Sequence, residues 1–171
     1  DALIVPALLT VVFMSLISFL IYKHLNTIER NERELHKIAY TDSLTNTPNR
    51  RAFNNFLEEL AKKGEPFALV YIDFNKFTLI NETAGHEYGD MALNEAVTRW
   101  KHIMNENDFI ARLSGDEFAL VVTDYKNSDS LVDHVKKFST VLDTKVTIDD
   151  QSVFISASFG ISLFPQHTKD L

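Results

Sequence analysis

Acidic residues stand beside apolar stretches at two places in the chain. Asp73 ends the apolar run Phe67–Asp73, and Asp116 and Glu117 lie in a Ser-Gly-Asp-Glu tetrapeptide between two further apolar runs. If these runs form neighbouring strands, three carboxylates meet at one edge of a sheet. Close carboxylates repel one another, and a divalent cation removes that cost. Because ligands that are all oxygen favour Mg²⁺ or Ca²⁺, the pattern indicates a metal site that faces phosphate oxygens.

Each feature also has an ordinary explanation. The Ser114–Glu117 segment is compatible with a plain hairpin turn whose acids point to water. Asp73 is compatible with a turn residue or a helix cap, and residues 81–90 with a surface loop. The combination, in this order and spacing, favours the functional interpretation.

Apolar periodicity predicts the elements that position these acids. The order of helices and strands predicts an α+β fold with a mixed or antiparallel sheet flanked by helices. Helices are expected over about 48–63, 90–105 and 130–142, and strands over 67–73, 108–113, 118–122, 145–148 and 153–164.

Composition excludes several classes of protein. The 171 residues include no cysteine, which excludes a disulfide scaffold, thiolate metal sites and a cysteine nucleophile. The formal net charge of -7 makes the chain a poor binder of nucleic acid. We therefore expect no nucleic-acid partner, and we expect a metal cation to mediate any contact with a phosphorylated ligand.

The N-terminal residues 1–22 are predicted to form a transmembrane helix. No charged residue occurs from Ala2 to Tyr22, and a helix of this length spans roughly 31 Å, about one bilayer core. A buried soluble helix and a signal peptide fit this segment less well. The basic residues that follow predict a cytoplasmic domain anchored in the inner membrane; they are Lys23, Arg30, Arg33 and Lys37.

Residues 23–41 contain neither proline nor glycine and are predicted to be a helical linker. Five residues in it, four of them apolar, recur at alternating spacings of three and four, which is typical of the seam of a short parallel coiled coil. A continuous helix that extends the preceding segment explains the pattern equally well. The seam positions are Leu25, Ile28, Glu32, Leu35 and Ala39.

Five segments together resemble the GGDEF family of diguanylate cyclases. The resemblance extends over about residues 40–165, and the five motifs together are a very specific combination. The segments are Asp42–Arg51 (DSLTNTPNRR), Ile72–Phe77 (IDFNKF), Ile80–Asp90 (INETAGHEYGD), Ala111–Phe118 (ARLSGDEF) and Ser156–Ser162 (SASFGIS).

The resemblance implies a palm-like, ferredoxin-type core over residues 42–171 and a defined reaction. Family members condense two GTP molecules into cyclic di-GMP and release pyrophosphate. Each domain binds one GTP, so the resemblance implies an active homodimer. Because the chain opens with Asp1 and stops at Leu171, we expect a domain that is truncated at its C-terminus. We also expect an upstream sensor and a further domain downstream.

The resemblance also implies roles for individual residues. The metal, Mg²⁺ or alternatively Mn²⁺, would be bound by the carboxylates of Asp73 and Asp116 and by the backbone carbonyl of Phe74, with Glu117 assisting. Asp116 or Glu117 would help to deprotonate the attacking 3′-hydroxyl. Asn81 and Asp90 would bind the guanine edge, and the other substrate-binding positions would be Phe77, Thr78, His86, Ser114 and Gly115.

Some positions depart from the family pattern. Ser114 replaces the first glycine of the signature, and Thr78 stands where the family usually has a lysine that contacts the triphosphate. The inhibitory product site of the family needs an Arg-x-x-Asp sequence. The matching segment here, Asn105–Asp108, has asparagine in place of the arginine, so we expect no feedback inhibition of that kind. These departures leave a second interpretation open: an impaired GTP-binding domain that regulates a partner or a downstream phosphodiesterase domain.

Overall fold

The computed structural model describes all residues except 1–3, 144–145, 149–150 and 168–171. The chain forms two compact units, residues 1–39 and residues 40–171, and each is described by itself. Residue 145, at the start of a predicted strand, lies outside the described residues.

The N-terminal unit is formed by helix α1 (Ile4–Tyr40), which is continuous over 37 residues and whose last residue, Tyr40, is counted with the second unit. The prediction of a helical segment over 23–41 is therefore confirmed up to Tyr40. From Lys23 onward the helix carries charged side chains, most of them between Glu29 and Lys37. Within the range that the structure describes, no helix combines the length and apolar character needed to cross a membrane. The transmembrane helix expected over 1–22, and the membrane location derived from it, thus receive no support.

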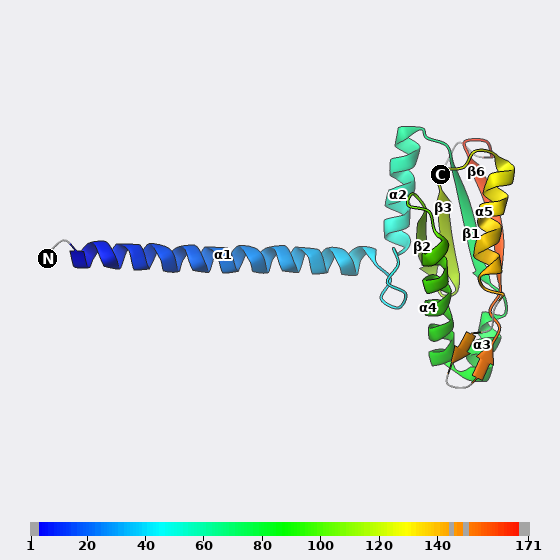
Figure 1. The fold of residues 1–171 in the computed structure, drawn as a ribbon, viewed down its shortest axis with the longest axis horizontal. Helices are drawn as coiled ribbons and strands as arrows, with labels where there is room; N and C mark the ends of the chain where they lie inside the picture. The colour runs from blue at the N-terminus through cyan, green and yellow to red at the C-terminus, as the bar shows by residue number, and fades with distance from the viewer. Residues whose placement is uncertain (1–3, 144–145, 149–150, 168–171) are drawn as a thin grey trace. The chain divides into compact units, whose positions relative to one another are not determined.

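The second unit is built on a four-stranded sheet in the order β2-β3-β1-β6 (Figure 1). Every pair of neighbours in this sheet is antiparallel, which settles the choice left open between a mixed and an antiparallel sheet. The strands are β1 (Phe67–Phe74), β2 (Phe109–Ser114), β3 (Glu117–Val122) and β6 (Ala157–Phe164).

Side chains of the sheet alternate between two apolar clusters, as the two-residue period of a strand requires. On one face, β1 and β3 pack against helices α4 (His86–Ile103) and α5 (Ser128–Thr140) around the fully buried Trp100. On the other face, alternate residues pack against α2 (Arg50–Lys63). The predicted α+β fold with helices flanking the sheet is confirmed.

Helix α2 begins and ends where its sequence provides caps. The Asn49 side chain accepts hydrogen bonds from the backbone N–H groups of Arg51 and Ala52, which otherwise have no partner in the first turn. Gly64 ends the helix in the left-handed conformation, with φ 69°, and this conformation is favourable for glycine. Phe53, Leu57 and Leu60 form the buried stripe of the helix.

The segment between β1 and α4 differs from the prediction. Residues 81–90 were expected to include a loop, but they belong to α3 (Phe77–Ala84) and to the first turn of α4. The two helices are separated only by Gly85, whose φ of 96° suits glycine. A short helix has too few turns for its apolar period to stand out in a sequence, which explains the wrong prediction.

The C-terminal strand prediction is also corrected in part. The region expected as one strand over 153–164 divides into the end of β5 (Gln151–Val153) and β6. β5 pairs instead with β4 (Val146–Ile148) in a separate two-stranded sheet. Between β5 and β6 the chain approaches the end of β1, where the Asn75 N–H donates to the Ser156 carbonyl at 2.8 Å.

Trp100 provides a test of this core. Its indole Nε1–H donates to the Phe138 carbonyl at 2.9 Å, and its side chain is fully buried. Trp100→Phe removes the donor, leaves that carbonyl buried and opens space, so we expect a loss of about 2–3 kcal/mol in the free energy of unfolding. Urea denaturation measures this loss. Met91→Leu, at an exposed position of α4, serves as the control, and an equal effect of both substitutions would contradict this account.

Candidate active site

Two of the predicted acids are brought together by strand register. Asp73, the next-to-last residue of β1, lies directly opposite Glu117, the first residue of β3. Cross-strand partners project from the same face of a sheet with Cβ atoms about 5 Å apart. On its other side Asp73 lies opposite Ser158 of β6. The prediction that the strands carrying these acids are neighbours is confirmed.

The hairpin that carries the signature is tight and irregular. Gly115 and Asp116 form its turn, because Ser114 and Glu117 are the last paired residues. Gly115 has a φ of 36°, in the region that favours glycine. A shift in register between Arg112 and Ser114 places a β-bulge next to the turn, and bulges of this kind redirect nearby side chains.

The Glu117 carboxylate is held on the hairpin. It accepts a hydrogen bond from the Ser114 hydroxyl, a group that glycine at this position would lack. A guanidinium nitrogen of Arg50 lies 3.6 Å from the same oxygen, Oε2. By contrast, the side chains of Asp73 and Asp116 have no hydrogen bond or ion pair within the described residues.

The expected convergence of three carboxylates is not found. Within the described residues, no group of three His, Cys, Asp or Glu side chains is arranged so that it could hold a metal ion. Register brings Asp73 and Glu117 together, whereas Asp116 lies in the turn beyond the last strand pair. Mg²⁺ usually binds through one or two carboxylates and takes its other ligands from water and substrate phosphates. The pair formed by Asp73 and Glu117 fits a site of that kind.

A polar brace joins the segment before α2 to the signature hairpin. Nη1 of Arg112 lies 3.0 Å from Oδ1 of Asp42. The same guanidinium donates through Nε and Nη2 to the Gly115 carbonyl, at 2.9 and 2.7 Å. Arg50 adds a hydrogen bond from Nε to the Leu113 carbonyl at 3.1 Å. Sequence reasoning assigned no role to Asp42, Arg50 or Arg112, although all three lie in the segments that carry the family resemblance.

The brace changes the acidity of Asp42. Partial burial acts to raise the pKa of this carboxyl, but hydrogen bonds from Thr45 and Arg112, together with the positive charge of Arg112, hold the pKa below its ordinary value. Thr45 donates to it through both its backbone N–H, at 2.9 Å, and its hydroxyl, at 2.7 Å. The Asp42 carboxylate is therefore stabilised in its charged form.

A second group of predicted residues lies on α3 and α4. The Oδ1 atom of Asn81 is buried and, within the described residues, has no hydrogen-bond partner. Gly89 leaves room for it, since a Cβ atom at Gly89 would lie 2.0 Å from this oxygen. Asp90 follows Gly89 and is exposed. A buried amide oxygen without a partner is costly in a folded protein, so this arrangement is suited to a ligand that donates a hydrogen bond.

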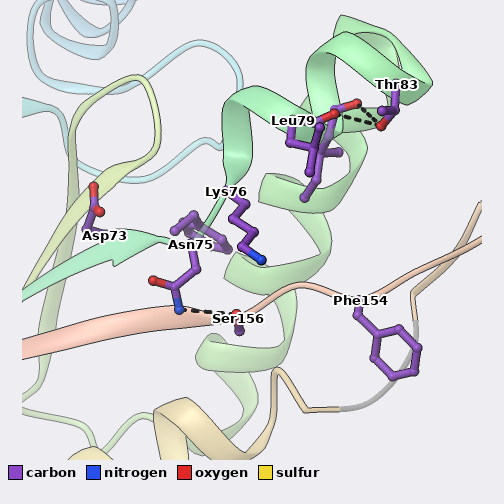
Figure 2. Close-up of a pocket in the computed structure, with 9 residues that line it drawn as sticks. Asp73, Asn75, Lys76, Leu79, Thr83, Phe154 and Ser156 are labelled. Carbon is purple, nitrogen blue, oxygen red and sulfur yellow. Dashed lines mark hydrogen bonds between the residues drawn. The ribbon is translucent and has the colours of Figure 1, made fainter.

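The remaining predicted residues are distributed around the same end of the sheet. Phe77 is buried and packs in the core, while Thr78 and His86 are exposed. A cavity of about 690 Å³ opens beside Asp73 and Phe74 and extends along one side of α3 (Figure 2). Lys76 and Ser156 also line this cavity; sequence reasoning did not select Ser156 as a site residue.

Comparison with known proteins decides the family. The family model described as "Diguanylate cyclase, GGDEF domain" matches residues 39–171. The chain belongs to the GGDEF family. The fold agrees: the solved GGDEF domain of TpbB (YfiN) from Pseudomonas aeruginosa superposes with a TM-score of 0.72 at 30% identity, covering 76% of this chain and 78% of that one.

Curated relatives of the GGDEF domain are longer proteins. Signaling protein YkoW of Bacillus subtilis is 31% identical over 157 residues, which are 89% of this chain and 20% of YkoW. The bifunctional diguanylate cyclase/cyclic di-GMP phosphodiesterase MucR of Pseudomonas aeruginosa is 33% identical over 143 residues, which are 81% of this chain and 21% of MucR. The chain thus spans about a fifth of the length of these two relatives.

The GGDEF domain uses Asp108, at the end of the segment compared with the inhibitory site, for an internal contact. Its carboxylate lies 2.7 Å from Nε2 of His134 in α5, and both side chains are at most one-tenth exposed. The Asn105 N–H also donates to this carboxylate, at 2.8 Å. The expectation that no product binds here rests on the missing arginine and stays a prediction. The structure shows in addition that the Asp108 carboxylate already has partners within the domain, His134 and the Asn105 N–H.

Asp42→Asn tests the brace of this GGDEF domain through pH. The pKa of Asp42 in the folded state is lower than in the unfolded chain, so its contribution to stability is complete above a pH of about 4 and is lost as the pH falls below that value. We expect the variant to lose about 1–2 kcal/mol of unfolding free energy at pH 7.

Urea denaturation between pH 3 and pH 7 measures this dependence, and the difference between variant and unmodified protein should shrink toward pH 3. Asp124→Asn, an exposed position, is the matched control. A difference that stays constant over the whole range would contradict the assignment.

Proposed function

We propose that this GGDEF domain is a diguanylate cyclase that condenses two GTP molecules into cyclic di-GMP, with release of pyrophosphate, as a homodimer. The observation that carries the proposal is the register of β1 and β3, which sets Asp73 opposite Glu117 beside the signature turn. The likeness to the named diguanylate cyclase TpbB supports it. Since GTP is the substrate, we place the domain in the cytoplasm.

The residues at the sheet end are suited to bind a divalent cation. Mg²⁺, or Mn²⁺ in its place, would be held by the Asp73 carboxylate and the Phe74 carbonyl, with Glu117 opposite Asp73 and Asp116 reaching the ion from the adjacent turn. When bound, such an ion neutralises phosphate charge and makes a neighbouring hydroxyl more acidic. The hydrogen bond from Ser114 and the contact with Arg50 keep Glu117 oriented.

Proton transfer is assigned to one of the two acids of the signature hairpin, Asp116, whose side chain has no partner among the residues that the structure describes. The 3′-hydroxyl of one GTP attacks the α-phosphate of the other, a new P–O bond forms, and the bond between the α- and β-phosphates breaks to release pyrophosphate. Asp116 has no hydrogen bond or ion pair within the described residues, whereas Glu117 is held by Ser114 and Arg50. We therefore assign acceptance of the 3′-hydroxyl proton to Asp116. In a second such step the 3′-hydroxyl of the other nucleotide attacks the remaining α-phosphate, releases the second pyrophosphate and closes the ring of cyclic di-GMP.

The base would be recognised between α3 and α4. Guanine offers N–H donors at N1 and N2, and the buried Oδ1 of Asn81 is an acceptor in need of a donor. The exposed carboxylate of Asp90, on the neighbouring helix, supplies a second acceptor. His86, Phe77, Thr78, Ser114 and Gly115 complete the proposed substrate-binding set.

A homodimer follows from the chemistry, because one domain presents one such site and the reaction joins two nucleotides. The seam of α1 supports pairing with a second copy. Leu25, Ile28 and Leu35 are 54%, 41% and 66% exposed on this helix and follow the spacing of a parallel coiled coil. Glu32 on the same seam makes the pairing weak.

Gly89→Ala tests base recognition. The added methyl group would lie 2.0 Å from Oδ1 of Asn81 and 3.1 Å from the Phe77 ring, so the amide must move. We expect the Kd for 3′-deoxy-GTP, which cannot cyclise, to rise about tenfold or more, as measured by titration calorimetry with Mg²⁺. Gly160→Ala is the matched control, since its methyl group would meet nothing within 4 Å. Equal affinity of the two variants would contradict the proposed guanine site.

Asp73→Asn tests the chemistry. The side chain has no hydrogen bond or ion pair to lose within the described residues, so the fold should persist while Mg²⁺-dependent release of pyrophosphate from GTP falls about 100-fold or more. In a homodimer, the specific rate should also increase with protein concentration. Asp124→Asn should leave turnover unchanged. If the unmodified protein binds GTP but releases no pyrophosphate, the chain is the regulatory GTP-binding domain and not a cyclase.

A further inference from the structure

A second cavity, of about 420 Å³, lies beside the signature hairpin and is rich in positive charge. Three of the four arginines in residues 40–171 line it, together with a single acid, in a chain whose formal net charge is -7. Positive charge gathered at one place in an acidic chain indicates an anionic ligand. We call this cavity the arginine pocket; its charged lining residues are Arg50, Arg51, Arg112 and Asp42.

The three arginines differ in how much of their hydrogen-bonding capacity the protein uses. Arg112 is occupied by the brace to Asp42 and to the turn. Arg50 is half-exposed and uses Nε and Nη2 on the hairpin. Arg51 is exposed, and within the described residues its guanidinium has neither a hydrogen bond nor an ion pair. Its Cζ atom lies 4.9 Å from the centre of the Tyr40 ring, a contact made through charge and not through a hydrogen bond.

Strand register places the arginine pocket and the cavity of about 690 Å³ on different sides of Glu117. At this end of the sheet Asp73 of β1 lies opposite Glu117 of β3, and Glu117 lies opposite Ser114 of β2. Asp73 lines the larger cavity and Ser114 lines the arginine pocket, and among the described residues the two cavities share no lining residue. The arginine pocket therefore lies on the β2 side of the paired acids, whereas the nucleotide cavity lies on the β1 side.

This arrangement bears on a reaction that joins two nucleotides. In the proposed function, the nucleotide of a domain has its base at α3 and α4 and its phosphates near Asp73. The second nucleotide has to reach the same acids from a facing domain. If it approaches from the β2 side, its phosphates meet the arginine pocket.

Guanidinium groups suit the charge that develops in this reaction. Attack on an α-phosphate increases the negative charge on its oxygens and on the departing pyrophosphate, and donors placed in advance lower the barrier. A guanidinium offers N–H groups in a planar fork that fits two phosphate oxygens at once. Arg50 and Arg51 are adjacent in the first turn of α2, which the Asn49 side chain caps, so their backbone is fixed before a ligand binds.

We infer that the arginine pocket binds the phosphates of the nucleotide held by the facing domain, with Arg51 as the main donor and Arg50 beside it. Each triphosphate in the homodimer is then held by Asp73 of its own domain and by Arg51 of the other domain. The inference rests on the proposed function, to which it adds a residue that each domain supplies to the reaction of its partner.

Arg51→Gln tests the pocket in the homodimer. We expect Mg²⁺-dependent release of pyrophosphate from GTP to fall about tenfold or more, the effect of losing one charge-assisted contact. The Kd for 3′-deoxy-GTP, measured on dilute, monomeric protein, should stay within twofold, because the nucleotide of the same domain does not reach the pocket. Arg51→Lys keeps the charge without the fork and should lose less activity. Lys62→Gln, exposed on the same helix, is the control and should change neither value.

A mixture of two variants tests whether the arginine acts on the nucleotide of the other domain. Each reaction step needs Asp73 of one domain and Arg51 of the other. A mixed dimer of Asp73→Asn and Arg51→Gln domains therefore has one step with both residues intact and one step with neither. Because the proposed pairing is weak, the variants exchange on mixing. We expect the mixture to form the linear dinucleotide, with release of one pyrophosphate, at least about fivefold faster than the mean of the two separate variants.

Three outcomes would overturn the inference. If Arg51→Gln releases pyrophosphate within twofold of the unmodified rate, the pocket does not serve the reaction. If the Kd for 3′-deoxy-GTP rises as much as turnover falls, Arg51 binds the nucleotide of its own domain. If the mixture forms linear dinucleotide no faster than the mean of the separate variants, the arginine acts within its own domain or only supports the hairpin. Unmodified protein that binds GTP without releasing pyrophosphate would instead refute the proposed function, and the inference with it.

Discussion

The pairing of β1 with β3 is the constraint on which the candidate site depends. Side chains alternate between the two faces of a sheet, so a slip of one residue would move Glu117 to the face covered by α4 and α5. The core prevents that slip, because Val70 and Ile72 of β1 and Phe118 and Leu120 of β3 are all fully buried on that face. The apolar packing of the sheet interior thus determines which acids stand together at its end.

The signature hairpin is held from outside the sheet as well. Asp42 reaches it through Arg112, and Arg50 reaches it through the Leu113 carbonyl. The polar stretch before α2, which as a sequence looks like an ordinary loop, therefore acts as a structural support for the turn. These contacts restrain a turn that contains a left-handed glycine and lies next to a register shift.

Much of the second unit could be predicted from the sequence. The helices around Leu57 and Phe138 have clear apolar periods, and the strands around Val70 and Leu120 could be identified from their continuous apolar runs. Helix α3 could not, because eight residues cover too few turns for a period to emerge. Its end depends on the backbone of Gly85, which composition alone does not reveal.

The sequence was a better guide to which residues lie at the candidate site than to how they are arranged there. Asp73 and Glu117 could be selected because each stands at the end of an apolar strand, and register brings them together. A group of three such side chains is not found among the described residues, since Asp116 lies in the turn beyond the last strand pair. The bracing roles of Asp42 and Arg112 depend on a contact between residues 70 positions apart, and no local pattern in a sequence encodes such a contact.

The buried Oδ1 atom of Asn81 affects the stability of the ligand-free domain and its affinity for a ligand in opposite directions. A polar atom enclosed without a partner lowers the stability of the empty fold, and a ligand donor that reaches it returns this free energy as affinity. An apolar residue of similar size there would be expected to strengthen the packing of α3 on α4 and, at the same time, to remove the acceptor that we propose for the base. At Asn81 and Gly89, the residues that would give the highest folding stability therefore differ from those that would give the highest ligand selectivity.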